Sequence, residues 1–211
     1  MHAIFCYGDS NTWGLDPATR NRHPRAATWP YVMARALGPA YDVAVDGLRG
    51  RTALLDDPLK PGRNGLASLP ERLAAHAPLD LVIIMLGTNN CKHVYGLDAH
   101  DIGLGIEAMG QLVLASDAGR DGTPPRLLLV APPPLEHEAG AGGRYRGGLQ
   151  KSRELAEQVR AIAATLGCAC CDAPSVARAS DVDGIHLGLD AHAALGNAMA
   201  DAVRRTLVSR P

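Results

Sequence analysis

Short apolar runs alternate with longer segments of mixed polarity along the chain. Two runs, at residues 79–86 and 126–131, are apolar almost throughout, as expected of strands buried on both faces of a parallel sheet. Three further short runs complete the set of predicted strands, at residues 3–7, 41–46 and 168–171.

Segments with apolar residues at helical spacing separate these strands. They predict helices over residues 28–38, 68–76, 98–118, 149–166 and 190–207. Thr28, Ser68 and Asp190 are the expected N-caps, and Glu71 stands at capping-box spacing from Ser68. The glycine-rich segment 135–148 is expected to form a mobile surface loop.

The regular alternation of strand and helix predicts an α/β fold, with a parallel sheet covered by helices on both faces. With 211 residues and no repeat or linker, residues 1–211 are predicted to form one domain. Ligands bind such sheets at the carboxyl ends of the strands. The segments there are 8–10, 47–50, 87–89 and 132–134, so we expect them to converge on one crevice.

Charge and composition narrow the class of partner. The formal net charge is −1, which argues against binding of nucleic acid or of an anionic membrane surface. No apolar run reaches the roughly 18 residues of a membrane span, and the N-terminus does not resemble a signal peptide. These features predict a cytoplasmic protein.

The five cysteines do not predict a disulfide framework, because their number is odd and the chain is long. Residues 168–171 include three of them, but no second Cys/His pair stands at zinc spacing. We therefore expect no metal site there, and interpret the strand cysteines as small buried apolar residues.

The turn after the first predicted strand carries the most suggestive chemistry. Asp9 and Ser10 could simply cap the next helix. Ser10 could equally be a nucleophile, with His186 as its base and Asp183 orienting the imidazole. Oxyanion donors would be the backbone N–H groups of Ser10 and Gly50 and the amide of Asn89. The other histidines are expected at the surface: His2, His23, His76, His93, His100, His137 and His192.

Four blocks of this sequence resemble, in order and spacing, those of the GDSL or SGNH hydrolase family. They are residues 8–10, Gly50, residues 87–89 and residues 183–186, and they contain the serine, glycine, asparagine and histidine of the family name. The resemblance covers nearly the whole chain. Residues 9–14, 56–58 and 80–89 look like the bacterial arylesterase and acyltransferase branch.

The resemblance implies a flavodoxin-like three-layer α/β/α sandwich with a five-stranded parallel sheet. It also implies a serine carboxylic ester hydrolase with a small-molecule ester as substrate, and water or an alcohol as acyl acceptor. No metal and no organic cofactor are implied, and a homo-oligomer is expected. Asn90 stands where the family usually has aspartate, which leaves any charge-dependent role of that position open.

The remaining site predictions concern substrate. Asp9 is expected to tie down the serine loop, and Asn11 to support its turn. Together with Trp13 and Ile185, they are the residues predicted nearest to bound substrate. Trp13, Ile185 and the stiff segment 132–134 would wall a narrow apolar cleft, which predicts short, acetyl-type acyl groups.

Several functions remain compatible with the sequence. Within the enzyme class they are an arylesterase, a carbohydrate or natural-product O-deacetylase, and a thioesterase or lysophospholipase-type enzyme. A non-catalytic nucleotide- or flavin-binding module is disfavoured, because the first strand–helix turn lacks Gly-x-Gly-x-x-Gly and a P-loop. A degenerate family member acting as an interaction surface is disfavoured by the presence of Ser10, Asn89, Asp183 and His186.

Overall fold

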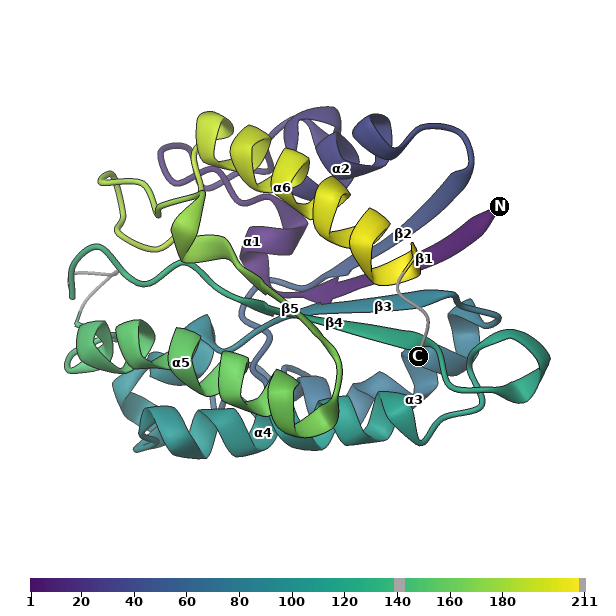
Figure 1. Ribbon diagram of the computed structural model, residues 1–211. Helices are drawn as coiled ribbons and strands as arrows, with labels where there is room; N and C mark the ends of the chain where they lie inside the picture. The colour runs from purple at the N-terminus through teal and green to yellow at the C-terminus, as the bar shows by residue number, and fades with distance from the viewer. Residues whose placement is uncertain (139–142, 209–211) are drawn as a thin grey trace.

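The sheet has five strands, and adjacent strands are parallel. Figure 1 shows this sheet at the centre of the molecule. The computed structural model describes residues 1–138 and 143–208. The spatial order is β2-β1-β3-β4-β5, the flavodoxin-like order. The strands are β1 (His2–Gly8), β2 (Tyr41–Gly47), β3 (Leu81–Met85), β4 (Arg126–Ala131) and β5 (Ala169–Asp172).

Helices cover both faces of this sheet (Figure 1), with α2 and α6 on one side and α3, α4 and α5 on the other. A single-turn helix, α1, follows β1. The predicted three-layer α/β/α sandwich is therefore confirmed. The helices are α1 (Ser10–Trp13), α2 (Trp29–Leu37), α3 (Gly65–His76), α4 (Ala99–Leu114), α5 (Gly148–Leu166) and α6 (Leu189–Val208).

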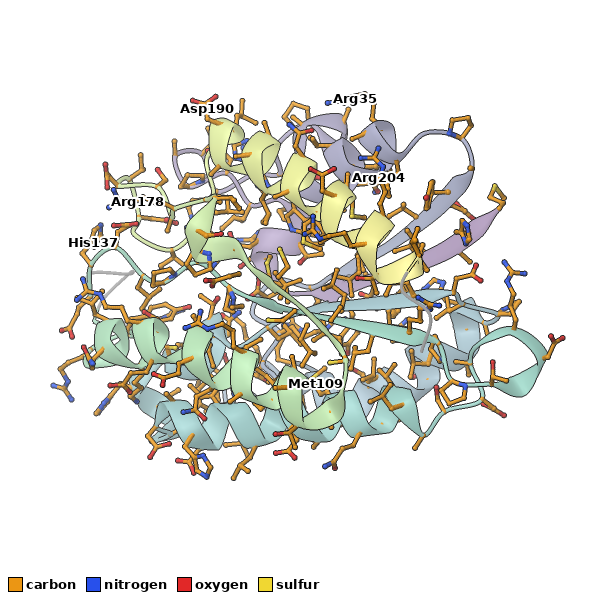
Figure 2. The ribbon with its side chains drawn as sticks, in the orientation of Figure 1. Arg35, Met109, His137, Arg178, Asp190 and Arg204 are labelled. Atoms are coloured by element: carbon orange, nitrogen blue, oxygen red, sulfur yellow. The ribbon has the colours of Figure 1, made fainter. Side chains whose placement is uncertain are left out.

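Two apolar clusters form the core, one on each face of the sheet. Alternate residues of β1 show the division: Ile4 packs with α2 and α6, whereas Phe5 packs with α3 and α4. Met109 of α4, labelled in Figure 2, is fully buried in the cluster that contains Phe5. The central strands are buried on both faces, which explains their continuous apolar sequence.

The carboxyl ends of β1, β2 and β3 lie side by side, since Gly8 pairs with Gly47 on one side and with Met85 on the other. Helix α1 packs directly against these ends. A Cβ added at Gly8 would lie 2.1 Å from Thr12 Oγ1, and one at Gly47 would lie 2.3 Å from Trp13 N. Only glycine allows the serine turn to sit so close to the strands.

Helix starts differ from the prediction at α3 and α6, whereas the predicted N-cap of α2, Thr28, is confirmed. Helix α3 begins at Gly65, because the Asn64 side chain accepts a hydrogen bond from Ala67 N. Ser68 thus lies inside the helix, and its hydroxyl hydrogen-bonds to that of Tyr7 at 2.7 Å. Asp190 lies in the first turn of α6. Thr28 flanks α2, but its hydroxyl donates to Arg25 O.

Burial also differs from the prediction at several positions. His192 is fully buried and His23 nearly so, because both lie between α6 and the segment leading to α2. Cys170 is exposed because β5 is an edge strand. Tyr145 is buried, so the segment 135–148 is not simply a surface loop. Residues 139–142 lie outside the described residues.

Candidate active site

Ser10 lies at the first position of α1, directly after β1. The carboxylate of Asp9 caps this turn by accepting a hydrogen bond from Asn11 N at 2.8 Å. Capping and presentation of the serine are therefore two effects of one turn. The side chain of Ser10 stays at the carboxyl end of the sheet, where the topology predicts a ligand site.

Ser10, His186 and Asp183 form a continuous hydrogen-bonded chain. Ser10 Oγ lies 2.8 Å from His186 Nε2, and His186 Nδ1 lies 2.6 Å from Asp183 Oδ2. The other carboxylate oxygen, Oδ1, accepts hydrogen bonds from the backbone N–H groups of Ile185 and His186. Residues 183–186 thus form a turn in which the Asp183 carboxylate fixes the orientation of the His186 imidazole.

Asp183 is held in its ionised form. Burial raises its pKa, but the hydrogen bonds from the His186 side chain and backbone outweigh burial and lower the pKa to about 2. Arg20 Nη1 also donates to Oδ2 at 2.7 Å. An ionised Asp183 accepts from Nδ1 of His186 and leaves Nε2 free to accept the proton of Ser10.

Three further hydrogen bonds hold the histidine loop in place. The Asn11 amide donates to Ile185 O at 3.2 Å and accepts from Leu187 N at 3.1 Å. On the β4 side, Glu136 N donates to Gly184 O at 3.0 Å. Arg178, labelled in Figure 2, forms an ion pair with the carboxylate of Glu136. The loop is therefore tied to both neighbouring segments of the sheet edge.

Gly50 and Asn89 lie in the segments that follow β2 and β3, the two strands that flank the strand leading to Ser10. All three line one cavity. Gly50 has a positive φ of 84°, a conformation that glycine adopts without strain. Asn89 Nδ2 donates to Arg51 O at 3.0 Å and lies 3.3 Å from Asp9 Oδ2.

Arg51 and Tyr145 support this group, and neither was identified from the sequence. Arg51 Nη1 donates to Gly8 O and Asp46 O, and its guanidinium lies 4.0 Å from the Tyr7 ring centroid. Tyr145 OH donates to Asn89 Oδ1 at 3.3 Å. The position of Arg51, directly after Gly50, could have indicated from the sequence that it lies near the site. Tyr145 stands alone in a glycine-rich segment, and nothing in the sequence around it indicated such a role.

Asn90 has a structural role that suits an amide. Its Oδ1 accepts from Ala53 N at 2.7 Å, and its Nδ2 donates to Leu54 O at 2.8 Å. An aspartate could provide only the acceptor half of this pair. Asn90 therefore ties the segment after Gly50 to the end of β3 through one donor and one acceptor.

The cavity above Ser10 has a volume of about 100 Å³. Among the described residues its apolar walls are Leu15, Tyr145 and Ile185. Ile185 is thus placed as predicted. Asp9 and Asn11 are not among the described lining residues, because their side chains are used within the turn and in tethering the histidine loop.

Trp13 is also placed differently from the prediction. The guanidinium groups of Arg22 and Arg49 lie 5.1 and 5.4 Å from the centroid of its ring, and Trp13 is not among the described lining residues of the cavity. Residues 132–134 do not line this cavity either, as far as the structure describes it. The described residues contain no cluster of three potential metal ligands and no helix able to span a membrane.

Comparison with known proteins agrees with this geometry. Residues 6–194 match the model of the GDSL-like Lipase/Acylhydrolase family. No curated protein matches the chain. Three similar solved structures extend over nearly the whole chain.

The native aryl esterase of M. smegmatis is 40% identical, with a TM-score of 0.93, over 98% of this chain and 100% of that one. Est24, a carbohydrate acetylesterase from Sinorhizobium meliloti, is 37% identical with a TM-score of 0.93, over 97% and 99% of the two chains. An arylesterase candidate from Agrobacterium tumefaciens strain C58 is 45% identical with a TM-score of 0.90, over 98% and 100%.

These matches exclude the reading of the chain as a nucleotide- or flavin-binding module. The family match spans most of the chain, and the similar structures include esterases. The chain therefore belongs to the GDSL-like lipase/acylhydrolase family and is a serine ester hydrolase.

Proposed function

We propose that this hydrolase cleaves short-chain, acetyl-type carboxylic esters through an acyl-enzyme on Ser10, and that it also transfers the acyl group to alcohols. The observation that carries the proposal is the chain from Ser10 Oγ through His186 to Asp183, with distances of 2.8 and 2.6 Å, at a cavity of about 100 Å³.

In the proposed reaction, Ser10 Oγ attacks the ester carbonyl carbon while His186 Nε2 takes the serine proton. The N–H groups of Ser10 and Gly50 and the Asn89 amide stabilise the resulting oxyanion. Collapse of the tetrahedral intermediate expels the alcohol, which receives its proton from His186. Water or a second alcohol, deprotonated by His186, then attacks the acyl-enzyme and regenerates Ser10.

Intact-mass spectrometry with a fluorophosphonate probe and turnover of 4-nitrophenyl acetate test this proposal. We expect one adduct on the wild-type chain, and neither adduct nor turnover for Ser10→Ala. Circular dichroism should show the same fold for the variant, because the substitution removes one oxygen atom and no core volume. Full labelling of Ser10→Ala would refute the assignment of the nucleophile.

A carbohydrate O-deacetylase is the second candidate, favoured by the similarity to Est24. A panel of acetylated sugars, compared with aryl acetates by kcat/KM, separates the two candidates. A thioesterase or lysophospholipase-type enzyme that acts on long acyl groups would instead require a longer acyl pocket. Self-association and a cytoplasmic location remain proposals from the sequence, and sedimentation of the purified protein would test the first.

A further inference from the structure

Positive charge is concentrated around the cavity of Ser10, although the whole chain carries a formal net charge of −1. Arg20, Arg49, Lys60, Lys92 and Arg144 all line this cavity, and no acidic side chain does so among the described residues. Such a lining favours a substrate that carries negative charge.

Two of these five cations already have partners in the protein. Arg20 forms an ion pair with Asp183, and Arg49 lies over the Trp13 ring. Their charges therefore have an explanation within the site and its surroundings.

The other three cations are not fully neutralised. Lys92 Nζ lies 3.7 Å from Asp57 Oδ2, which is longer than the roughly 2.7–2.9 Å of a charge-assisted hydrogen bond. Within residues 1–138 and 143–208, Lys60 and Arg144 form no ion pair. Residues 139–142, which lie between the two described ranges, are alanine and glycine and carry no carboxylate side chain.

A second cavity, of about 290 Å³, adjoins the first at these same three cations. Lys60, Lys92 and Arg144 line both cavities. Beyond them, the larger cavity is bounded mainly by Pro58, Leu59 and Val94, with Asp57 as its one acidic residue among those described.

The order from Ser10 outward is thus a small reaction cavity, a cationic junction and a larger, mostly apolar cavity. The Lys92 side chain is only 12% exposed, and its burial lowers its pKa. An anion bound at the junction would relieve the cost of that buried charge.

We propose that the active site selects esters whose alcohol portion carries an anionic group, a carboxylate or a phosphate, that binds between Lys60, Lys92 and Arg144. This substrate class rests on the proposed function of Ser10. The acyl group occupies the small cavity, the anion occupies the junction, and any remaining part of the alcohol extends along the apolar walls. Charged groups at such a mouth also accelerate encounter with oppositely charged substrates.

Two acetate esters of nearly equal shape test the proposal: 4-acetoxybenzoate, which is anionic, and 4-acetoxybenzamide, which is neutral. Each kcat/KM is divided by the rate of uncatalysed hydrolysis, so that leaving-group reactivity cancels. We expect the wild-type enzyme to favour the anionic ester by about tenfold or more, as one or two hydrogen bonds to a charged group would give. The preference should fall as salt is added. 4-Acetoxyphenyl phosphate extends the test to the second anion.

We expect each of three variants, Lys60→Gln, Lys92→Gln and Arg144→Gln, to reduce the preference for the anionic ester severalfold. The kcat/KM for the neutral ester, 4-acetoxybenzamide, should stay nearly unchanged. Lys151→Gln, which removes the remaining lysine of the chain from a position on α5, is the matched control and should retain the wild-type preference. Lys60 and Arg144 are exposed, so their variants remain informative even if Lys92→Gln fails to fold.

Cleavage of the neutral ester, 4-acetoxybenzamide, distinguishes failure of the anion preference from failure of the proposed esterase function. If both esters are cleaved at equal corrected rates, the anion preference is refuted while the esterase stands. If the three variants lower both rates alike, the cations act on the reaction itself and the proposal is also refuted. Failure to cleave either ester, or 4-nitrophenyl acetate, would instead overturn the function of Ser10.

Discussion

At the scale of single residues, the charge on Asp183 should decide the rate. Asp183→Asn keeps the shape of the side chain but can present its amide N–H groups to His186 Nδ1, which favours the wrong imidazole tautomer. We expect kcat to fall by roughly 10³–10⁴ with little change in KM. Stopped-flow measurement of acyl-enzyme formation would check this, with the exposed neighbour variant Asp181→Asn as control. A near-normal rate would mean that another group orients His186.

The low pKa of Asp183 adds a pH argument. The pKa of Asp183 is about 2 in the folded protein and about 3.9 in the unfolded chain. The stabilisation of the fold by the ionised carboxylate is therefore complete above about pH 4. That contribution is lost as the pH falls from about 4 to about 2. Any loss of activity between pH 7 and 5 must therefore come from groups other than this carboxylate.

Asn90 offers a second prediction at this scale. Asn90→Asp would remove the donor to Leu54 O and place a carboxylate oxygen against that carbonyl. Because Asn90 is fully buried, we expect a loss of about 1–3 kcal/mol in the free energy of unfolding. Urea denaturation measures this loss. An unchanged midpoint would show that the site accepts the aspartate usual in the family, for example by binding a proton.

The sequence predicted the three residues that the structure joins by hydrogen bonds, Ser10, His186 and Asp183, but not all of their neighbours. Ser10, Asp183 and His186 stand in short local motifs, so their positions could be inferred without the fold. Tyr145 hydrogen-bonds to Asn89 although the two residues are 56 positions apart in the sequence, and the Trp13 ring contacts the guanidinium groups of Arg22 and Arg49. Such long-range contacts have no local signature.

At the scale of elements, the contact between α2 and α6 contains a buried histidine. His192 Nδ1 accepts a hydrogen bond from Trp29 N at 3.2 Å, and the His23 ring stands edge-on at 5.4 Å. Burial, assisted by the nearby His23 and His186, lowers the pKa of His192 to about 3. The folded protein therefore holds this side chain neutral at pH values where the unfolded chain protonates it.

This difference predicts acid sensitivity. The unfolded chain binds a proton near pH 6.5, so stability declines as the pH falls below that value, by about 2 kcal/mol at pH 5. In His192→Asn, the amide oxygen still accepts from Trp29 N but does not titrate. Denaturation midpoints at pH 7 and pH 5 should therefore differ less for the variant than for the wild type. Equal pH dependence would show that His192 is not responsible.

Element boundaries show why local patterns are only partly predictive. Strand β4 was predicted with the observed bounds because continuous apolarity and a following proline mark it clearly. The start of α3 was misplaced because both Asn64 and Ser68 are good caps, and the hydroxyl of Ser68 is instead used by Tyr7 of β1. His192 was assigned to the surface because helical periodicity alone does not say which polar residue faces α2.

At the scale of the whole molecule, the sheet order places Ser10, Gly50 and Asn89, which follow β1, β2 and β3, around one cavity. The dimensions of that cavity predict acyl selectivity. An acetyl group fits within about 100 Å³ between Leu15, Tyr145 and Ile185. An octanoyl chain would have to leave this space past Lys60, Lys92 and Arg144, where an apolar chain displaces water from charged groups. The larger apolar cavity beyond them does not remove this barrier.

We therefore expect kcat/KM for 4-nitrophenyl esters to fall from two acyl carbons to four, and far more steeply to eight. The predicted walls have changed, since Leu15 and Tyr145 now stand where Trp13 and residues 132–134 were expected, but the short-acyl preference follows from the observed cavity as well. Ile185→Ala enlarges the cavity and should raise the rate with the butyryl ester relative to the acetyl ester. A series that rises toward eight carbons would show that acyl chains cross the cationic junction, and would favour a thioesterase or lysophospholipase-type enzyme.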